Sequence, residues 1–147
     1  QARWLTGCAD AAQASESAWR DLARRLDGYV LRPGDDSFYE TALPHNLRYA
    51  DVLPQGIAMC VGTSDVQTSI LWAREHDIGL VARAGSHSYA GFSSTQGLMI
   101  NVTPMSSVAV DTSLGTVTSG AGARNGDVAA ALAPHRIAIP RGRRSSS

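Results

Sequence analysis

The segment that most constrains the fold of this chain reads Arg83-Ala84-Gly85-Ser86-His87-Ser88-Tyr89-Ala90-Gly91. It directly follows the apolar run Ile78-Gly79-Leu80-Val81-Ala82, which predicts a buried strand. Small residues leave the main-chain N–H groups of such a loop uncovered, so a phosphate can approach them closely. The loop also carries the imidazole of His87, whose small neighbours cannot bury it. The segment is therefore either an anion-binding loop or a surface turn.

Around this loop the sequence predicts layers of helices and strands, the α/β class. Apolar residues at helical spacing, among them Trp19 and Leu22, indicate a first helix that ends at Gly28. Ser64 and Gln67 are spaced as a capping box, and Asn125 is the expected N-cap of a later helix. The expected helices cover 12–27, 38–43, 64–77 and 126–133; the expected strands cover 57–61, 80–83, 98–102, 107–111, 116–119 and 137–139.

Composition excludes several classes of function. The chain has 147 residues, 44% hydrophobic and 18% charged, with 13 basic and 13 acidic side chains. Such a balance gives no field suited to nucleic acid or to an anionic membrane surface. No apolar run approaches the roughly 18 residues that a transmembrane helix needs. We expect an ordinary globular chain.

The two cysteines do not form a disulfide framework or a metal cage. Cys60 lies in the apolar run 57–61 and is expected to be a buried thiol. Leu5-Thr6-Gly7-Cys8 matches a lipoprotein-processing pattern, but the apolar segment that precedes such a pattern is missing. We therefore expect a cytoplasmic protein, with an exported or lipidated form as the alternative.

A second glycine-rich stretch reads Gly120-Ala121-Gly122-Ala123-Arg124-Asn125-Gly126. Its spacing differs from that of the dinucleotide-binding fingerprint, and it follows a predicted hairpin rather than a parallel strand. It remains either an anion site at a helix N-terminus or a tight turn. His45, His76 and His135 show no metal-ligand spacing, and no nucleophile elbow or phosphate-binding Walker pattern is present.

The segment Gly85-Ser86-His87-Ser88-Tyr89-Ala90-Gly91 closely resembles the Gly-Gly-His-Ser-Tyr-x-Gly loop of FAD-linked oxidases. These belong to the vanillyl-alcohol oxidase / p-cresol methylhydroxylase (PCMH-type) class, berberine-bridge-enzyme-like branch. The resemblance runs from Pro54 to Gly142 and includes the Asn101-Val102-Thr103 strand end. Asn46 lies where that family has an Asn-x-Arg segment.

The resemblance implies an FAD site. Its first loop would cradle the pyrophosphate of FAD with main-chain amides, and His87 would bond covalently to the 8α carbon of the flavin. By position the cofactor-binding residues would be Arg83, Gly85, Ser86, His87, Ser88, Gly91, Gly120 and Gly122. No metal is expected, and no catalytic base is assigned.

Two departures from the family pattern qualify this picture. Ser86 replaces the second glycine, which costs about 1 kcal/mol if the position needs a positive φ. Members with a second, cysteinyl flavin link carry a cysteine where this chain has Arg144 after Ile139-Pro140-Arg141-Gly142-Arg143, so that link is excluded.

The resemblance implies three segments. These are an N-terminal helical and irregular segment, a partial PCMH-type FAD-binding domain incomplete at its C-terminus, and a polar tail, at 1–50, 51–142 and 143–147. The implied activity is oxidation of a small alcohol, sugar or amine-type substrate by hydride transfer to FAD, with dioxygen reoxidising the flavin. A truncated, inactive remnant and a cell-wall sugar-nucleotide reductase with non-covalent FAD remain the alternatives.

Overall fold

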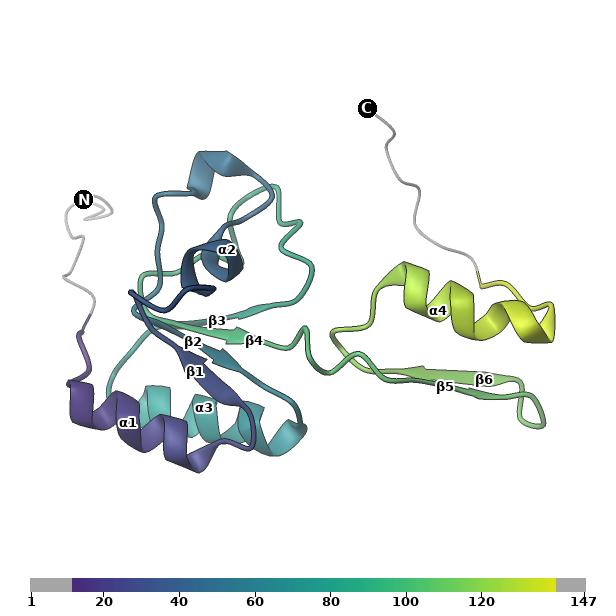
Figure 1. Ribbon diagram of the computed structural model, residues 1–147, viewed down its shortest axis with the longest axis horizontal. Coiled ribbons are helices and arrows are strands. Elements are labelled where there is room, and N and C mark those ends of the chain that lie inside the picture. Colours follow the sequence, from purple (N-terminus) through teal and green to yellow (C-terminus); the bar gives the residue numbers. More distant parts are fainter. Residues whose placement is uncertain (1–11, 140–147) are drawn as a thin grey trace, which may run out of the picture. The chain divides into compact units, whose positions relative to one another are not determined.

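A computed structural model describes residues 12–139 of the chain (Figure 1). The chain divides into two compact units, residues 1–104 and residues 105–147. The first holds a mixed sheet with helices on both faces, and the second holds a hairpin with one α-helix. This combination of helices and small sheets agrees with the predicted fold class.

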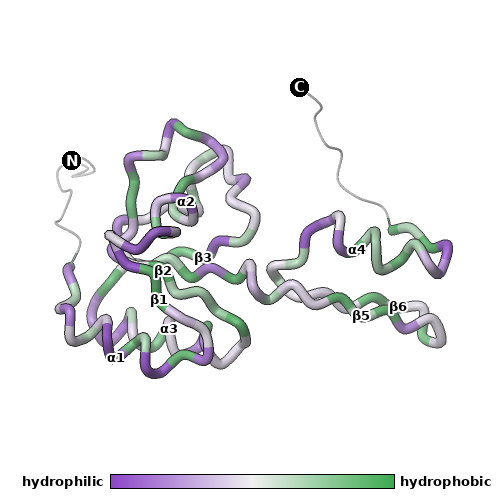
Figure 2. The backbone as a smooth tube through the Cα atoms, in the orientation of Figure 1, coloured by the Kyte–Doolittle hydropathy of each residue, from purple (hydrophilic) through white to green (hydrophobic). Residues whose placement is uncertain are grey.

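The sheet of the first unit has the strand order β1-β2-β4-β3. The two central strands are β2 (Gly56–Met59) and β4 (Leu98–Asn101), which run parallel to each other. β3 (Leu80–Arg83) pairs in parallel with β4, and β1 (Tyr29–Leu31) pairs antiparallel with β2. Every residue of β2 and β4 is buried, and Figure 2 shows hydrophobic residues in these central strands.

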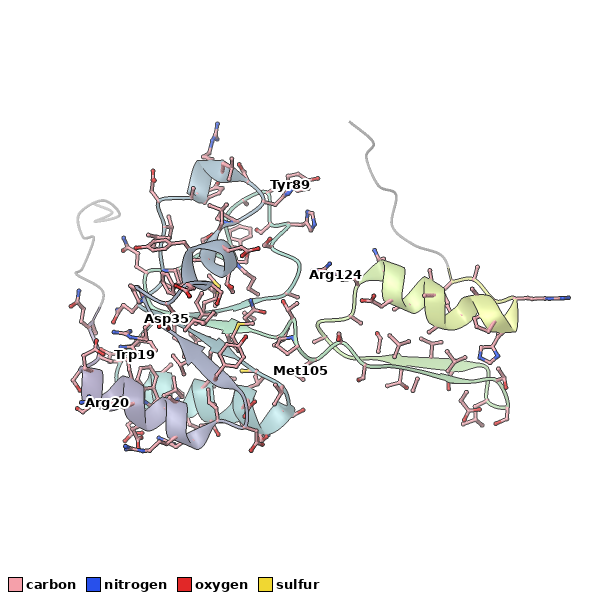
Figure 3. All side chains as sticks on the ribbon, viewed as in Figure 1. Trp19, Arg20, Asp35, Tyr89, Met105 and Arg124 are labelled. Carbon is pink, nitrogen blue, oxygen red and sulfur yellow. The ribbon has the colours of Figure 1, made fainter. Side chains whose placement is uncertain are left out.

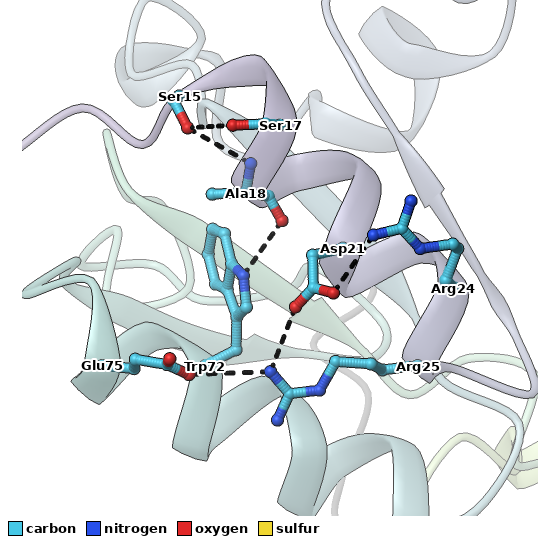
Figure 4. A network of polar contacts seen from close by, with 8 residues as sticks. All are labelled: Ser15, Ser17, Ala18, Asp21, Arg24, Arg25, Trp72 and Glu75. Carbon is cyan, nitrogen blue, oxygen red and sulfur yellow. Dashed lines mark hydrogen bonds and ion pairs between the residues drawn. The ribbon is translucent and has the colours of Figure 1, made fainter.

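Helices cover one face of this sheet. α1 (Glu16–Arg25) and α3 (Thr63–Glu75) lie together on that face (Figure 1). The rings of Trp19 and Trp72 lie 4.5 Å apart, and the Trp72 indole N–H donates to the main-chain oxygen of Ala18 at 3.1 Å. Figure 4 shows this bond beside the ion pairs of Asp21 and Glu75 with Arg25. The indole pair therefore joins the two helices through both packing and a hydrogen bond.

The other face carries the short helix α2 (Phe38–Ala42) and the 3₁₀ turn η1 (Leu47–Tyr49). Its apolar core consists of Leu31, Phe38, Ala42, Ile57, Met59 and Met99. The Phe38 side chain is fully buried, which anchors α2 on the sheet. This face is the one from which the candidate site is built.

The second unit pairs β5 (Val108–Asp111) antiparallel with β6 (Thr116–Ser119). α4 (Asn125–Leu132) follows and continues into the 3₁₀ turn η2 (Ala133–His135). Among the described residues of this unit, Val128 and Leu132 are the buried apolar side chains. The unit therefore has a much smaller core than the first.

Most predicted elements form at about the predicted positions, and the predicted buried thiol of Cys60 is confirmed. The capping box of Ser64 and Gln67 is wrong, because α3 begins at Thr63 with Gly62 as its N-cap and no side-chain cap bond. Asn125 is the first residue of α4 rather than its N-cap, and Arg124 holds the cap position. Strand β1 was not predicted.

Two strand predictions also need correction. β3 is not buried: it lies at the edge of the sheet, where Arg83 is the one buried residue of the four. Residues 137–139 form no strand, because no strand among the described residues pairs with them. Cys8 and the polar tail at 143–147 lie outside the described residues.

Candidate functional site

The loop at residues 84–97 begins at the carboxyl end of β3 and returns the chain to β4. Ligands of parallel sheets bind beyond the carboxyl ends of their strands, so the loop lies at the usual place for a site. The side chains of Tyr89 and Phe92 project from it and are 80% and 83% exposed (Figure 3, where Tyr89 is labelled). The loop is therefore held by its backbone rather than by burial of its largest side chains.

Its main chain has the properties of an anion cradle. The N–H groups of residues 85–91 donate to no described residue. Ser86 adopts a φ of 54°, in the left-handed region that places successive N–H groups on one concave side. This confirms that the serine stands where glycine would be unstrained. A row of unpaired N–H groups is what the pyrophosphate of a dinucleotide needs.

Gly91 ends this row, and its position admits only a residue without a side chain. Its φ is 74°, and a Cβ atom there would lie 2.6 Å from the ring of Tyr49. Tyr49 belongs to η1, so the close approach seats this turn directly on the loop. Gly85 is less constrained, because a Cβ atom there would meet Cδ2 of His87 at an ordinary 3.4 Å.

A second segment braces the loop through main-chain contacts. The His45 N–H donates to the main-chain oxygen of Ser86 at 3.1 Å, and the Asn46 side-chain amide donates to that of Tyr89 at 2.8 Å. The Asn46 side chain also accepts from the Arg48 N–H at 3.2 Å and so caps η1. These contacts give Asn46, singled out by the sequence, a structural role.

His87 is exposed, and its imidazole lies beside a second imidazole. The ring centroids of His45 and His87 are 4.5 Å apart, with a 49° angle between the ring planes. The sequence assigned no role to His45, because contacts between residues far apart in the sequence, such as the hydrogen bond to Ser86, bring these segments together. The Asn-x-Arg resemblance one residue later was the one pointer to this segment.

Arg83 has its polar atoms occupied within the protein. Its guanidinium donates to the main-chain oxygens of Thr41, Ala42 and Ser93 at 3.2, 2.6 and 3.0 Å, and to the Ser94 hydroxyl at 3.2 Å. Burial lowers the pKa of this guanidinium, although arginine remains charged at every physiological pH. Arg83 therefore joins the end of α2 to the far side of the loop, and a contact of its side chain with a cofactor stays a prediction.

Gly120 and Gly122 belong to the second unit. Their N–H groups donate to the main-chain oxygens of Ser107 and Met105 at 2.8 and 3.0 Å. A Cβ atom at Gly120 would lie 2.0 Å from the Met105 oxygen, so glycine is required there for main-chain packing. A contact of either glycine with a cofactor stays a prediction, and it cannot use these N–H groups.

Two other kinds of site find no support in the described part of the chain. Within residues 12–139, no cluster of three or more histidine, cysteine, aspartate or glutamate side chains is arranged to hold a metal ion. None of the helices in that range has the length and apolar character needed to span a bilayer.

Comparison with known proteins gives this loop a context. Residues 54–145 match the family described as FAD binding domain. The uncharacterized FAD-linked oxidoreductase YgaK of Bacillus subtilis is 30% identical over 122 residues, which is 80% of this chain and 26% of the relative. The (R)-6-hydroxynicotine oxidase of Paenarthrobacter nicotinovorans is 26% identical over 118 residues, again 80% and 26%.

Solved structures agree at the level of the fold. The 6-hydroxy-D-nicotine oxidase of Arthrobacter nicotinovorans matches with a TM-score of 0.71 and 26% identity, over 74% of this chain and 24% of that one. The BBE-like 1 protein of Physcomitrella patens matches with a TM-score of 0.77 and 23% identity, over 84% and 28%. The chain thus spans about a quarter of the length of the proteins it resembles.

Proposed function

Because the chain belongs to the FAD binding domain family, we propose that it supplies the pyrophosphate-binding part of an FAD-dependent oxidoreductase. The observation that carries the proposal is the row of unpaired N–H groups at residues 85–91, bent by the positive φ of Ser86 and Gly91. Such a cradle suits two adjacent phosphates, which accept several hydrogen bonds at once.

The residues that hold FAD divide by role. The main chain of Gly85, Ser86, Ser88 and Gly91 binds the pyrophosphate, while Arg83 holds the loop that presents it. His87, exposed within this row, is the attachment point for the flavin. Since Arg144 stands at the position of the second link, attachment is through the histidine alone.

The bound flavin supplies a two-electron acceptor that a protein side chain cannot. In the whole protein we propose oxidation of a small alcohol, sugar or amine-type substrate, for which FAD would supply the hydride acceptor and dioxygen would be the final electron acceptor. Support for this chemistry comes from the relatives, whose names include an FAD-linked oxidoreductase and an (R)-6-hydroxynicotine oxidase.

Acid precipitation of the full protein tests the attachment. A covalent flavin stays with the denatured pellet and fluoresces in a denaturing gel. We expect fluorescence in the natural protein, none in His87→Ala, and unchanged fluorescence in His135→Ala, which removes an exposed imidazole from η2. A colourless pellet from flavin-loaded natural protein, or a fluorescent one from His87→Ala, would refute attachment at this residue.

A further inference from the structure

Of the two imidazoles in contact at the loop, His45 has no role in the function proposed so far. Resting on that function, we infer that His45 is a positioning residue for flavin attachment, which holds the His87 ring in the orientation that bonds to the flavin. The inference concerns the rate at which the covalent bond forms, and not the affinity for FAD.

The first step of the argument is the contact itself. Centroids 4.5 Å apart and planes tilted by 49° place the two rings in direct van der Waals contact. The His87 ring is also close to Gly85, since a Cβ atom added there would lie 3.4 Å from Cδ2. The His87 ring therefore has both the ring of His45 and the main chain of Gly85 close to it.

The second step is that His45 cannot easily drift away. Its own N–H is bonded to Ser86 at 3.1 Å, and the next residue, Asn46, is bonded to Tyr89 at 2.8 Å. These two bonds flank His87 in sequence. Pro44 on the other side is buried and has a restricted φ. The backbone therefore presents the His45 ring to His87 from a fixed anchor.

The third step is the need for orientation. An exposed side chain on a loop exchanges among rotamers, and only some of them aim a ring nitrogen at a bound flavin. Formation of the bond removes one hydrogen from the imidazole and one from the 8α methyl group. Both hydrogens, with their electrons, end on dioxygen as hydrogen peroxide. A neighbouring ring that removes unproductive rotamers accelerates this step, because correct orientation lowers the barrier.

The test compares three variants of the full protein after FAD is added to flavin-free material. We expect His45→Ala to slow acid-stable flavin formation roughly two- to tenfold, the range for one aromatic contact, with an unchanged amount of bound FAD. His45→Phe keeps a ring and is expected to attach flavin near the natural rate. His135→Ala is the matched control for loss of an exposed imidazole.

A second measurement does not depend on flavin. In ¹³C-histidine-labelled, flavin-free protein, His45→Ala should shift the ring-proton resonances of His87, because the ring current of its neighbour is lost. His135→Ala should leave them in place. Unshifted His87 resonances in His45→Ala would show that the rings are not in contact and would overturn the inference.

The outcomes of the kinetic test separate the two proposals. Natural-rate attachment in His45→Ala overturns the positioning role and leaves the attachment at His87 standing. Equal slowing in His45→Phe also overturns the positioning role, because it points to the ring nitrogens of His45. Loss of bound FAD in His45→Ala overturns it as well, because it points to a structural role. Natural protein that binds FAD without attaching it overturns both the attachment at His87 and the positioning role of His45.

Discussion

At the scale of single residues, Arg83 shows how a loop with little core of its own is held in place. Its side chain is 2% exposed and spans from the last turn of α2 to Ser93 and Ser94. A planar guanidinium reaches all of these acceptors together, whereas an ammonium group is a compact point charge on a flexible stem. The loop therefore depends on arginine in particular.

We expect Arg83→Lys to lower the free energy of unfolding by about 2 kcal/mol, because several buried carbonyls lose their charged donor. Arg20→Lys, an exposed site on α1, should change it by less than about 0.5 kcal/mol. Urea titration of the two variants of the full protein measures both values. Equal stability of the two variants would show that the guanidinium contacts contribute nothing.

Cys60 is the buried residue whose ionisation links stability to pH. Burial raises the pKa of its thiol from 9.0 to about 11; the hydrogen bond with Ser69 partly offsets this, and the charge of Asp65 adds to it. The folded state therefore keeps the proton longer than the unfolded state does. The contribution of this thiol to stability is complete below pH 9 and is lost as the pH rises toward 11.

The expected loss between these two pH values is roughly 2–3 kcal/mol, since each unit of pKa shift corresponds to about 1.4 kcal/mol. The measurement is the difference between the natural protein and Cys60→Ala, because the comparison cancels the effects of groups other than the thiol. The variant should lose less stability over this interval. Parallel pH profiles would mean that Cys60 does not couple ionisation to folding.

At the scale of elements, the side chain of Asp65 joins helix α3 to the connection before β1 and to the segment that follows β2. Its carboxylate is 1% exposed and accepts from the N–H groups of Asp27, Gly28 and Val61 at 2.8, 3.1 and 2.9 Å. These donors lie in the connection from α1 to β1 and at the end of β2, while Asp65 is in the first turn of α3. One side chain thus fixes the start of the strand that the sequence did not reveal.

Asp65→Asn should lower the free energy of unfolding by about 2–3 kcal/mol, because an amide N–H₂ faces donors where the carboxylate accepted from them. Glu75→Gln changes an acid at the exposed end of the same helix and should cost less than about 0.5 kcal/mol. Thermal unfolding of both variants provides the comparison. If Asp65→Asn lost no more free energy of unfolding than Glu75→Gln, the Asp65 carboxylate would not be what holds these elements together.

The sequence predicted the elements that depend on local patterns and missed those that depend on contacts between residues far apart in the chain. Helix α3 and strand β4 were found because their apolar patterns are local. Strand β1 has only three residues and exists through pairing with β2 and through Asp65, contacts that no local pattern contains. The same holds in the site: the loop was found from its composition, whereas the contact of His45 depends on the fold.

At the scale of the whole chain, the two units differ in how well their backbone is protected. β2 and β4 are buried throughout and each has a strand on both sides. β5 and β6 form a two-stranded sheet. Half-buried and exposed residues alternate in β5, and most residues of β6 are exposed. Two-stranded hairpins are marginally stable, and such segments open locally at low free-energy cost.

Hydrogen–deuterium exchange of the full protein should therefore separate the units. We expect the amides of β2 and β4 to exchange slowest and those of β5 and β6 at least tenfold faster, since a difference of about 1.4 kcal/mol in opening free energy suffices. Added FAD should slow exchange at residues 85–91, whose N–H groups have no partner among the described residues. Protection of that segment without a change in β2 would indicate direct contact, because general stabilisation slows both. Unchanged exchange at 85–91 in FAD-saturated protein would contradict the proposed cradle.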